Sequence, residues 1–302
     1  MPGNWLQSLR HLDTMLEEAE IAFADGRQRE HAQVLEGAQE TFHREGGPWR
    51  EALRQCWVGF LRSIAGGHQG RALASCEIAI DIAEVHELEE LRAFADCCKA
   101  QIHLIAGDLL AGRLAGIRAL AAFEARGNIQ WACRTLWHLS SIMNAMEAWE
   151  ESLGYCYRAL AYARSGTNTR LLLVALWRIG STLILSSHPG AGLRWCDAAL
   201  ALAPLPLDHA MITAVQGNGL VKIGKIEEGV RQLEEAVAWF AASSLTHMRL
   251  LFSMHLGNAY AQQGRELNAR DVFADIATTS SKNGYSRLAQ SAQSALDTLK
   301  GA

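Results

Sequence analysis

The sequence is poor in proline, carries no excess of basic charge and contains no long apolar run. Only 5 of its 302 residues are proline, and because proline is excluded from helix interiors these positions mark candidate boundaries. The 28 basic and 32 acidic side chains give a net charge of −4, which offers no large positive field for a nucleic-acid backbone. The longest apolar candidate starts at Leu171 and is interrupted at Arg178, well short of the ~18 residues of a membrane span. We therefore expect no nucleic-acid partner and no membrane partner.

Signatures of disulfide bonds, metal binding and catalysis are missing as well. The 7 cysteines are an odd number scattered through apolar surroundings, which is typical of buried thiols. No His-x-x-x-His or Cys-x-x-Cys pair occurs, and in the nearest cluster Cys97, Cys98 and His103 would point in different directions on a helix. There is no Gly-x-Ser-x-Gly elbow, phosphate-binding loop or Rossmann glycine pattern. We expect no metal, no cofactor and no enzymatic activity.

The rest of the composition is that of a folded cytoplasmic protein. Apolar residues make up 49% of the chain and charged residues 20%, which is enough apolar surface for a sizeable core. The first residues, Met-Pro-Gly-Asn-Trp5, lack the basic region and apolar stretch of a secretory signal. Together with the reduced thiols, this start predicts a cytoplasmic location.

An internal repeat of about 40 residues organises the chain. Small residues recur at that spacing: Ala19, Gly59, Ala100, Ser140, Gly180, Gly217 and Gly257. The position seven residues after each of them is mostly glycine: Gly26, Gly66, Gly107, Glu147, Ser187, Gly224 and Gly264. The position nineteen residues after each small residue is alanine or isoleucine: Ala38, Ile78, Ala119, Ala159, Ala199, Ala236 and Ile276. Three parallel series at one spacing indicate a repeat architecture.

We interpret each repeat as two antiparallel helices. The small residue lets the second helix approach closely, the glycine ends the first helix in the left-handed conformation, and the third position marks the contact on the second helix. Apolar residues recur at helical spacing, and no stretch shows sustained period-two alternation. The sequence therefore predicts an all-α solenoid of about seven antiparallel helix pairs with a C-terminal capping helix.

The repeats predict one solenoid domain over residues 1–302. Four of the five prolines fall at proposed seams: Pro48, Pro189, Pro204 and Pro206. The seven repeats are expected at residues 8–46, 47–87, 88–127, 128–167, 168–205, 206–244 and 245–283, and the capping helix at 285–299. An alternative interpretation is that this last helix leads into a further domain outside these residues.

The last repeat resembles the tetratricopeptide repeat (TPR). Leu256-Gly257-Asn258-Ala259-Tyr260, followed by Gly264, Ala269 and Phe273, matches the family pattern of the two helices and their turn. The resemblance covers roughly residues 10–299, although Arg62 and His103 replace the family's aromatic in two early repeats. It implies a right-handed superhelix with an inner groove. The long repeat is similar to the helical-repeat regions of MalT-type regulators, Rap-like peptide sensors and diguanylate cyclase sensor regions.

In the tetratricopeptide family the residue after the small position points into the groove. Here these residues are Glu20, Phe60, Gln101, Ser141, Ser181, Asn218 and Asn258. The resemblance implies that Asn218 and Asn258 bond the backbone of an extended ligand, with Lys222 one turn on able to meet a carboxylate. Ala214 and Met254 stand where a carboxylate-clamping member has lysine, and these residues could equally be polar groups on a solvated face.

One turn earlier, the groove positions of two neighbouring repeats are Trp137 and Trp177. Large aromatic rings beside hydrogen-bonding side chains form a candidate anchor pocket, although tryptophan is also common in packing between helices. The predicted groove residues are Arg134, Trp137, Ser141, Asn144, Trp177, Ser181, Asn218, Lys222, Met254 and Asn258. The other tryptophans, including Trp57 and Trp131, are expected to be packing residues.

The sequence therefore predicts a non-enzymatic scaffold that binds a peptide, a protein segment or a small ligand in its groove. It would be the sensory or regulatory part of a bacterial signalling protein. The alternative is an oligomerisation module, in which outer faces or the last helix form a homodimer that controls an attached output domain, with no ligand in the groove. A dimer lost on removal of residues 285–302 would favour this second class.

Overall fold

The structure is a computed structural model that describes residues 11–19, 27–65, 69–166, 168–203 and 205–301. Over these residues the secondary structure is helical and contains no strand. The first helices of the successive pairs are residues 11–19, α4 (Gly47–Ala65), α6 (Glu89–Ala106), α8 (Ile129–Ala145), α10 (Thr169–Leu185), α12 (Pro206–Lys222) and α14 (Thr246–Gln262). The second helices are α2 (Gln28–Gly37), α5 (Gln69–Val85), α7 (Leu109–Ala125), α9 (Trp149–Ser165), α11 (Pro189–Leu200), α13 (Ile226–Ala242) and α15 (Glu266–Asn283).

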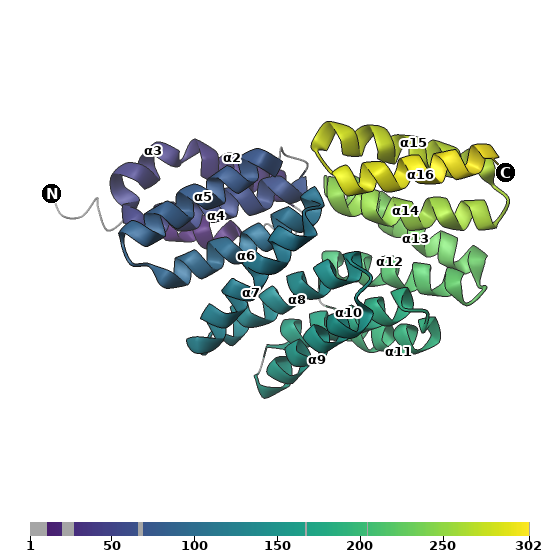
Figure 1. The fold of residues 1–302 in the computed structure, drawn as a ribbon, viewed down its shortest axis with the longest axis horizontal. Helices are drawn as coiled ribbons and strands as arrows, with labels where there is room; N and C mark the ends of the chain where they lie inside the picture. The colour runs from purple at the N-terminus through teal and green to yellow at the C-terminus, as the bar shows by residue number, and fades with distance from the viewer. Residues whose placement is uncertain (1–10, 20–26, 66–68, 167, 204, 302) are drawn as a thin grey trace.

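Two short elements and a terminal helix complete the chain. The α3 (Gln39–Thr41) and η1 (Phe42–Gly46) segments join α2 to α4, and α16 (Ser286–Gly301) follows α15. Each helix packs against the next one along the chain, and first helices such as α4, α6 and α8 also pack against each other (Figure 1). This arrangement confirms the predicted all-α solenoid of helix pairs. The helix bounds support the division into seven repeats, which remains a proposal.

The turns within the pairs adopt the predicted left-handed conformation. The predicted turn residue, one or two positions after the end of the first helix, has a positive φ in the five described cases: Gly107 (92°), Glu147 (59°), Ser187 (69°), Gly224 (86°) and Gly264 (71°). The other two predicted turns, at Gly26 and Gly66, lie outside the described residues. Three prolines also lie where predicted: Pro189 and Pro206 begin α11 and α12, and Pro48 is in the first turn of α4. Pro204 is outside the described residues.

The predicted contacts between paired helices are present in most pairs; Ala38 is partly buried and directly follows the end of α2. A Cβ added at Gly180 would lie 2.6 Å from the Cys196 sulfur on the partner helix, which shows how close the two backbones come. Most third positions are buried: Ala119, Ala159, Ala199, Ala236 and Ile276. The prediction for Ile78 is wrong, because this side chain is 46% exposed while the neighbouring Ala79 is fully buried. The inner face of α5 is therefore shifted by one residue from the common register.

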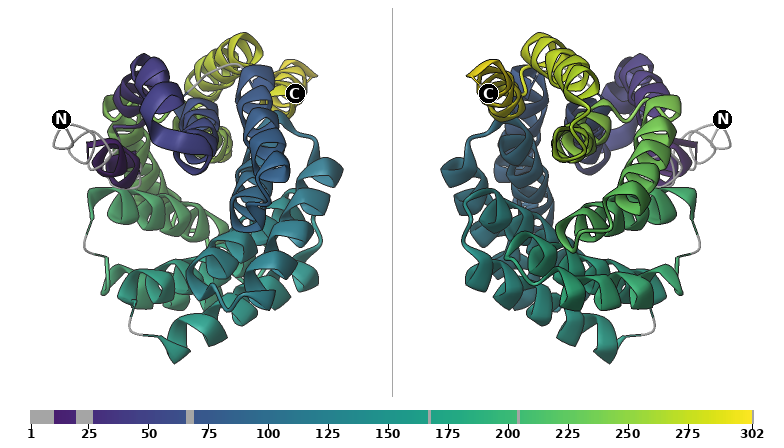
Figure 2. Two further views of the ribbon diagram at one scale, coloured as in Figure 1. Left: turned by 90° about the vertical axis from the view of Figure 1, so that its left-hand side faces the viewer. Right: turned by 90° about the vertical axis from the view of Figure 1, so that its right-hand side faces the viewer.

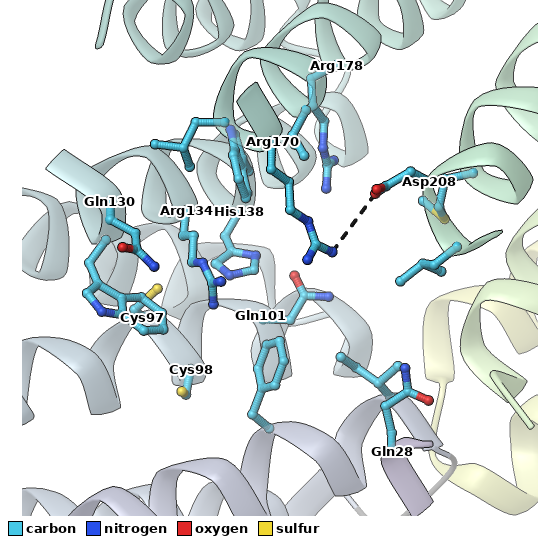
Figure 3. A pocket seen from close by; sticks show the side chains of 18 of the residues that line it. Gln28, Cys97, Cys98, Gln101, Gln130, Arg134, His138, Arg170, Arg178 and Asp208 are labelled. Carbon is cyan, nitrogen blue, oxygen red and sulfur yellow. Dashed lines mark ion pairs between the residues drawn. The ribbon is translucent and has the colours of Figure 1, made fainter. Parts of the chain in front are cut away.

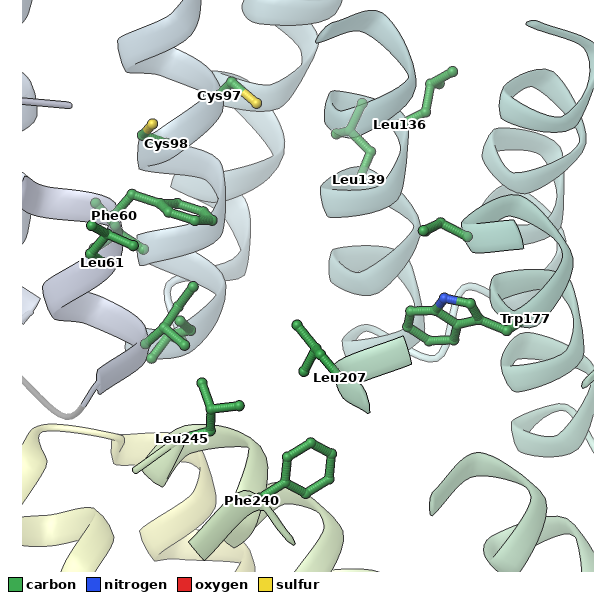
Figure 4. Close-up of a cluster of buried hydrophobic side chains, with 14 of the residues drawn as sticks. Phe60, Leu61, Cys97, Cys98, Leu136, Leu139, Trp177, Leu207, Phe240 and Leu245 are labelled. Atoms are coloured by element: carbon green, nitrogen blue, oxygen red, sulfur yellow. The ribbon is translucent and has the colours of Figure 1, made fainter. Parts of the chain in front are cut away.

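A continuous apolar core runs through the stack. Figure 4 shows part of it, where Leu61, Leu139 and Phe240 come from helices far apart in the sequence. All 7 cysteines are free thiols within buried surroundings, as predicted. The apolar surface is therefore buried between successive helices, as in other repeat architectures. No helix among the described residues is long and apolar enough to cross a membrane.

The last helices return to the first ones, so the solenoid closes into a ring. Helix α14 packs against α4, and α16 packs against α6 (Figure 2). Tyr285, at the start of α16, is fully buried, and its hydroxyl donates a hydrogen bond of 3.4 Å to the carbonyl of Ser63 at the end of α4. Its ring lies edge-on to His247, with 5.2 Å between the centroids. The capping helix thus covers the last pair and also joins the two ends of the chain.

Truncation of Tyr285 should open this ring. We expect Tyr285→Ala to lower the free energy of unfolding by about 3 kcal/mol, because a buried aromatic side chain is lost. The lost side chain belongs to the contact between the two ends of the stack. The radius of gyration from small-angle scattering should increase. Tyr157→Ala is the control, since Tyr157 is 47% exposed on α9 and far from the closure. An unchanged radius for Tyr285→Ala would show that the two ends do not depend on this contact.

Candidate ligand-binding cavity

The ring encloses a cavity of about 170 Å³. Helices α4, α6, α8, α10, α12 and α14 supply nearly all of its lining, so the first helices form the inner wall, as the repeat pattern predicts. Phe60 and Gln101, the residues that follow the small position in two early repeats, are among the lining residues. The repeat therefore brings equivalent positions of six successive first helices to one enclosed space.

Aromatic rings form one side of the cavity. Trp57, Phe60, Phe94 and Trp131 line it and pack edge-to-face, with 4.4 Å between the ring centroids of Phe94 and Trp131. Trp57 is 5% and Phe94 4% exposed, so these rings also belong to the core. Edge-to-face pairs hold aromatic side chains in fixed positions, which gives the cavity a rigid apolar surface for a ligand.

Basic side chains form another part of the lining. Arg134 of α8 and Arg170 of α10 point into the same space as the His138 imidazole and the Gln101 amide (Figure 3). The guanidinium of Arg134 lies 4.6 Å from the Trp131 ring centroid, and Arg170 approaches the carboxylate of Asp208 to 3.9 Å. The described lining thus combines three arginines, the third being Arg178, with one aspartate.

Arg178 is held by neutral partners. Its Nη1 donates a hydrogen bond to the Ser141 hydroxyl, and its guanidinium lies 4.4 Å from the centroid of the Trp177 ring. Its Nε is buried and has no hydrogen-bond partner among the described residues. Burial lowers the pKa of Arg178 to about 10, because the charged form loses water that the protein does not replace. The group remains a cation at neutral pH.

Three more polar atoms at the cavity lack partners within the described chain. They are Nε1 of Trp137, Nδ1 of His138 and Oδ2 of Asp208. Burial and the charges of Arg178 and Arg134 lower the pKa of His138 to about 3, so this imidazole is neutral at physiological pH. Burial also raises the pKa of the Asp208 carboxyl. Buried polar atoms are normally hydrogen-bonded, and a cluster without partners is typical of a site that receives a ligand.

The sequence-predicted residues divide into two groups. Arg134, Trp137 and Trp177 line the cavity, and the Ser141 hydroxyl accepts a hydrogen bond from the lining residue Arg178. The remaining predicted residues are not among its lining: Asn144, Ser181, Asn218, Lys222, Met254 and Asn258.

Contacts elsewhere explain part of this division. The Asn144 amide donates to the Thr182 hydroxyl at 3.1 Å, and Lys222 Nζ donates to the Ile184 carbonyl at 2.9 Å, so each joins neighbouring first helices. Asn218 is half-buried and Asn258 is exposed. The structure does not bring the two asparagines to this cavity, and their contact with a ligand stays a prediction.

Sequence reasoning missed several lining residues. Trp57 and Trp131, which were expected only to pack, also line the cavity, as do His138 and Arg178. Arg178 carries a signal that could have identified it, because it is the one charged residue in the largely apolar stretch from Leu171 to Leu185. A charge in such a helix must either reach water or line an interior site.

The cysteines of the cavity wall do not form a reactive or metal-binding site. Cys97 and Cys98 line the cavity, and burial raises the pKa of Cys97 to about 12, so the thiol stays protonated. The Thr135 hydroxyl donates to the Cys97 sulfur at 3.3 Å. Within the described ranges no group of three or more His, Cys, Asp or Glu side chains could hold a metal ion.

Comparison with known proteins identifies the fold. A Rap protein in complex with competence and sporulation factor superposes with a TM-score of 0.58 at 12% identity, over 97% of this chain and 98% of that chain. NprR in complex with its cognate peptide NprX gives a TM-score of 0.64 at 12% identity, over 93% and 87% of the two chains. The chain has the tetratricopeptide-type fold.

The fold also occurs as a sensor within a larger protein. A signal transduction ATPase with numerous domains and a tetratricopeptide repeat sensor, from Pyrococcus horikoshii, matches with a TM-score of 0.52 at 13% identity, over 99% of this chain and 50% of that chain. No family model and no curated protein sequence matches the chain. The similarity therefore lies in the fold of the tetratricopeptide-type repeats.

Proposed function

We propose that this chain is a non-enzymatic tetratricopeptide-type scaffold that binds a peptide, a protein segment or a small ligand in its central cavity. The observation that carries this proposal is the cavity itself, where partnerless polar atoms of Trp137, His138, Arg178 and Asp208 lie beside a rigid aromatic surface. Such a surface buries apolar groups of a ligand, while the polar atoms orient it. Ligand binding would then change the interaction of this chain with a partner protein or an attached output domain.

The size of the cavity suggests how a ligand would be held. Pockets for drug-sized ligands are commonly about 300–1,000 Å³, and this cavity of about 170 Å³ is smaller. It suits one or two side chains, with the rest of the ligand lying in the channel of the ring. NprR, which has the same fold, was solved with its cognate peptide NprX, which supports a peptide among the ligand classes.

The test is selection from a defined library of synthetic hexapeptides. Peptides that remain with the protein through size exclusion are identified by mass spectrometry. Met211→Trp places an indole in the cavity, because Met211 lines it from α12, and we expect it to reduce recovery of the selected peptides at least about tenfold. Met146→Trp is the matched control, since Met146 is 37% exposed and does not line the cavity.

Two outcomes would contradict the proposal. One is that the wild-type protein enriches no peptide. The other is that Met211→Trp and Met146→Trp enrich the same peptides equally, which would place binding elsewhere on the molecule. Circular dichroism and the melting temperature of both variants establish that each is folded.

The oligomerisation alternative has its own candidate surface. Leu110, Leu114 and Ile117 form an exposed apolar row along α7, with exposures of 65%, 60% and 42%. Part of the apolar stripe of α16 is instead covered within the same chain, by α14, α15 and α6. The cavity, with its convergent polar groups, favours ligand binding as the primary function.

A further inference from the structure

The arginine side of the cavity has an excess of positive charge. Among the described lining residues, Arg134, Arg170 and Arg178 face a single carboxylate, that of Asp208. Asp208 Oδ1 is 3.9 Å from the guanidinium of Arg170, so this carboxylate pairs with one of the three arginines. His138 stands between the other arginines and is neutral at physiological pH, so it neither adds to nor offsets the charge.

Arg178 is the most unusual member of this group. No ion pair joins it to a carboxylate in the part of the chain that the structure describes, and its two close partners, the Ser141 hydroxyl and the Trp177 ring, are uncharged. A buried cation normally has an anionic partner, because desolvation of an uncompensated charge is costly. The described residues supply no such partner to Arg178, and the Nε proton of this guanidinium is not donated to any of them.

We propose that the cavity recognises a ligand through an anionic group that binds Arg178, between Arg134 and Arg170. This inference rests on the proposed ligand-binding function and names the ligand class. A guanidinium offers its N–H groups in a planar fork that matches a carboxylate or phosphate. The partnerless Trp137 Nε1 is a further donor in the same cavity.

The aromatic side defines the second half of the ligand. Trp57, Phe60 and Trp131 line the same cavity, and the Trp131 ring centroid is 4.6 Å from the Arg134 guanidinium, so a bound anion would carry an apolar or aromatic group next to it. An acidic side chain or free carboxyl terminus beside an apolar residue in a peptide has this chemistry. A phosphorylated residue shares it, and the experiment separates the two.

Four pools of hexapeptides, amidated at the carboxyl terminus and matched except at one central position, test the proposal. That position is Asp, Asn, Lys or phosphoserine, and the flanking positions are randomised over apolar residues. We expect the wild-type protein to retain the Asp or phosphoserine pool at least about tenfold better than the Asn and Lys pools. Preference for Asp identifies a carboxylate ligand, and preference for phosphoserine identifies a phosphate.

Variants of Arg178 assign the preference to this side chain. Arg178→Gln should remove the difference between the Asp and Asn pools, whereas Arg178→Lys, which keeps the charge, should retain part of it. Arg194→Gln is the control, because Arg194 is exposed on α11, where its guanidinium donates a hydrogen bond to the Gly190 carbonyl. The melting temperature of each variant is measured in parallel.

The outcomes distinguish this inference from the function on which it rests. Equal retention of the Asp and Asn pools by the wild-type protein would overturn the anion inference while leaving peptide binding in place. Retention of none of the pools, nor of any member of the general hexapeptide library, would overturn both. An acidic preference that persists unchanged in folded Arg178→Gln would assign anion recognition to other residues and overturn the proposed role of Arg178.

Discussion

Gly180→Ala is expected to destabilise the protein by about 3 kcal/mol, as measured by urea unfolding. A Cβ at this position would lie 2.6 Å from the sulfur of Cys196 and 2.8 Å from the carbonyl oxygen of Gly192. Real Cβ atoms do not approach backbone oxygen this closely, so α10 and α11 must separate. Since interiors are packed at crystal-like density, that separation would also disturb the helices stacked on this pair.

The control for this substitution is Gly154→Ala. Gly154 is also inside a helix, α9, but it is exposed and an added Cβ would meet no atom within 4 Å. Alanine is a better helix former than glycine by about 1 kcal/mol, so this variant should be slightly more stable than the wild type. Comparable stability of the two variants would mean that the close approach at Gly180 is not a constraint on the stack.

Acidification from pH 7 to pH 5 is expected to destabilise the fold by about 4 kcal/mol through three histidines. Burial is the main cause that lowers the pKa of His138 to about 3 and the pKa values of His247 and His255 to about 4. Their unfolded pKa is about 6.5. The unfolded chain therefore takes up protons below that pH while the folded chain does not, so stability is present above pH 6.5 and falls as the pH approaches 4.

The size of this effect follows from the pKa difference. At pH 5 each group contributes at most about 2 kcal/mol, and this is halved for His138 and His255 because they are partly accessible to solvent, whereas His247 is buried. Urea unfolding at several pH values measures the slope. His138→Gln, His247→Gln and His255→Gln combined should flatten it, whereas His86→Gln, at an exposed position, should not. A triple variant with the wild-type slope would assign acid sensitivity to other groups.

His247 links this pH dependence to the closure of the ring. Its imidazole packs edge-on against Tyr285, and the charge of Arg287 contributes to its lowered pKa. Protonation would place a second positive charge next to Arg287 in a buried contact. We therefore expect the contact between α14 and α16 and the N-terminal helices to weaken first as the pH falls.

The candidate site was predicted in part because the repeat converts sequence spacing into spatial neighbourhood. Trp137 and Trp177 stand at equivalent positions of adjacent repeats, and helix stacking brings them to the same wall. Asn218 and Asn258 follow the same rule, but α12 and α14 line the cavity with residues near their starts, such as Met211 and Met248, and the asparagines lie further along these helices. Their position relative to the cavity depends on how far the superhelix has turned by that point, and the spacing alone does not contain that angle.

The local pattern of small residues, left-handed turns and apolar faces determined by itself that this chain is a stack of helix pairs, since each of these features acts within one or two helices. Only the tertiary structure decided that the stack closes on itself at Tyr285, and that Arg178 and His138 face an enclosed space. Closure is the sum of small rotations between successive repeats, so no short segment of sequence specifies it. The surroundings of a charged side chain then depend on what that closure brings opposite to it.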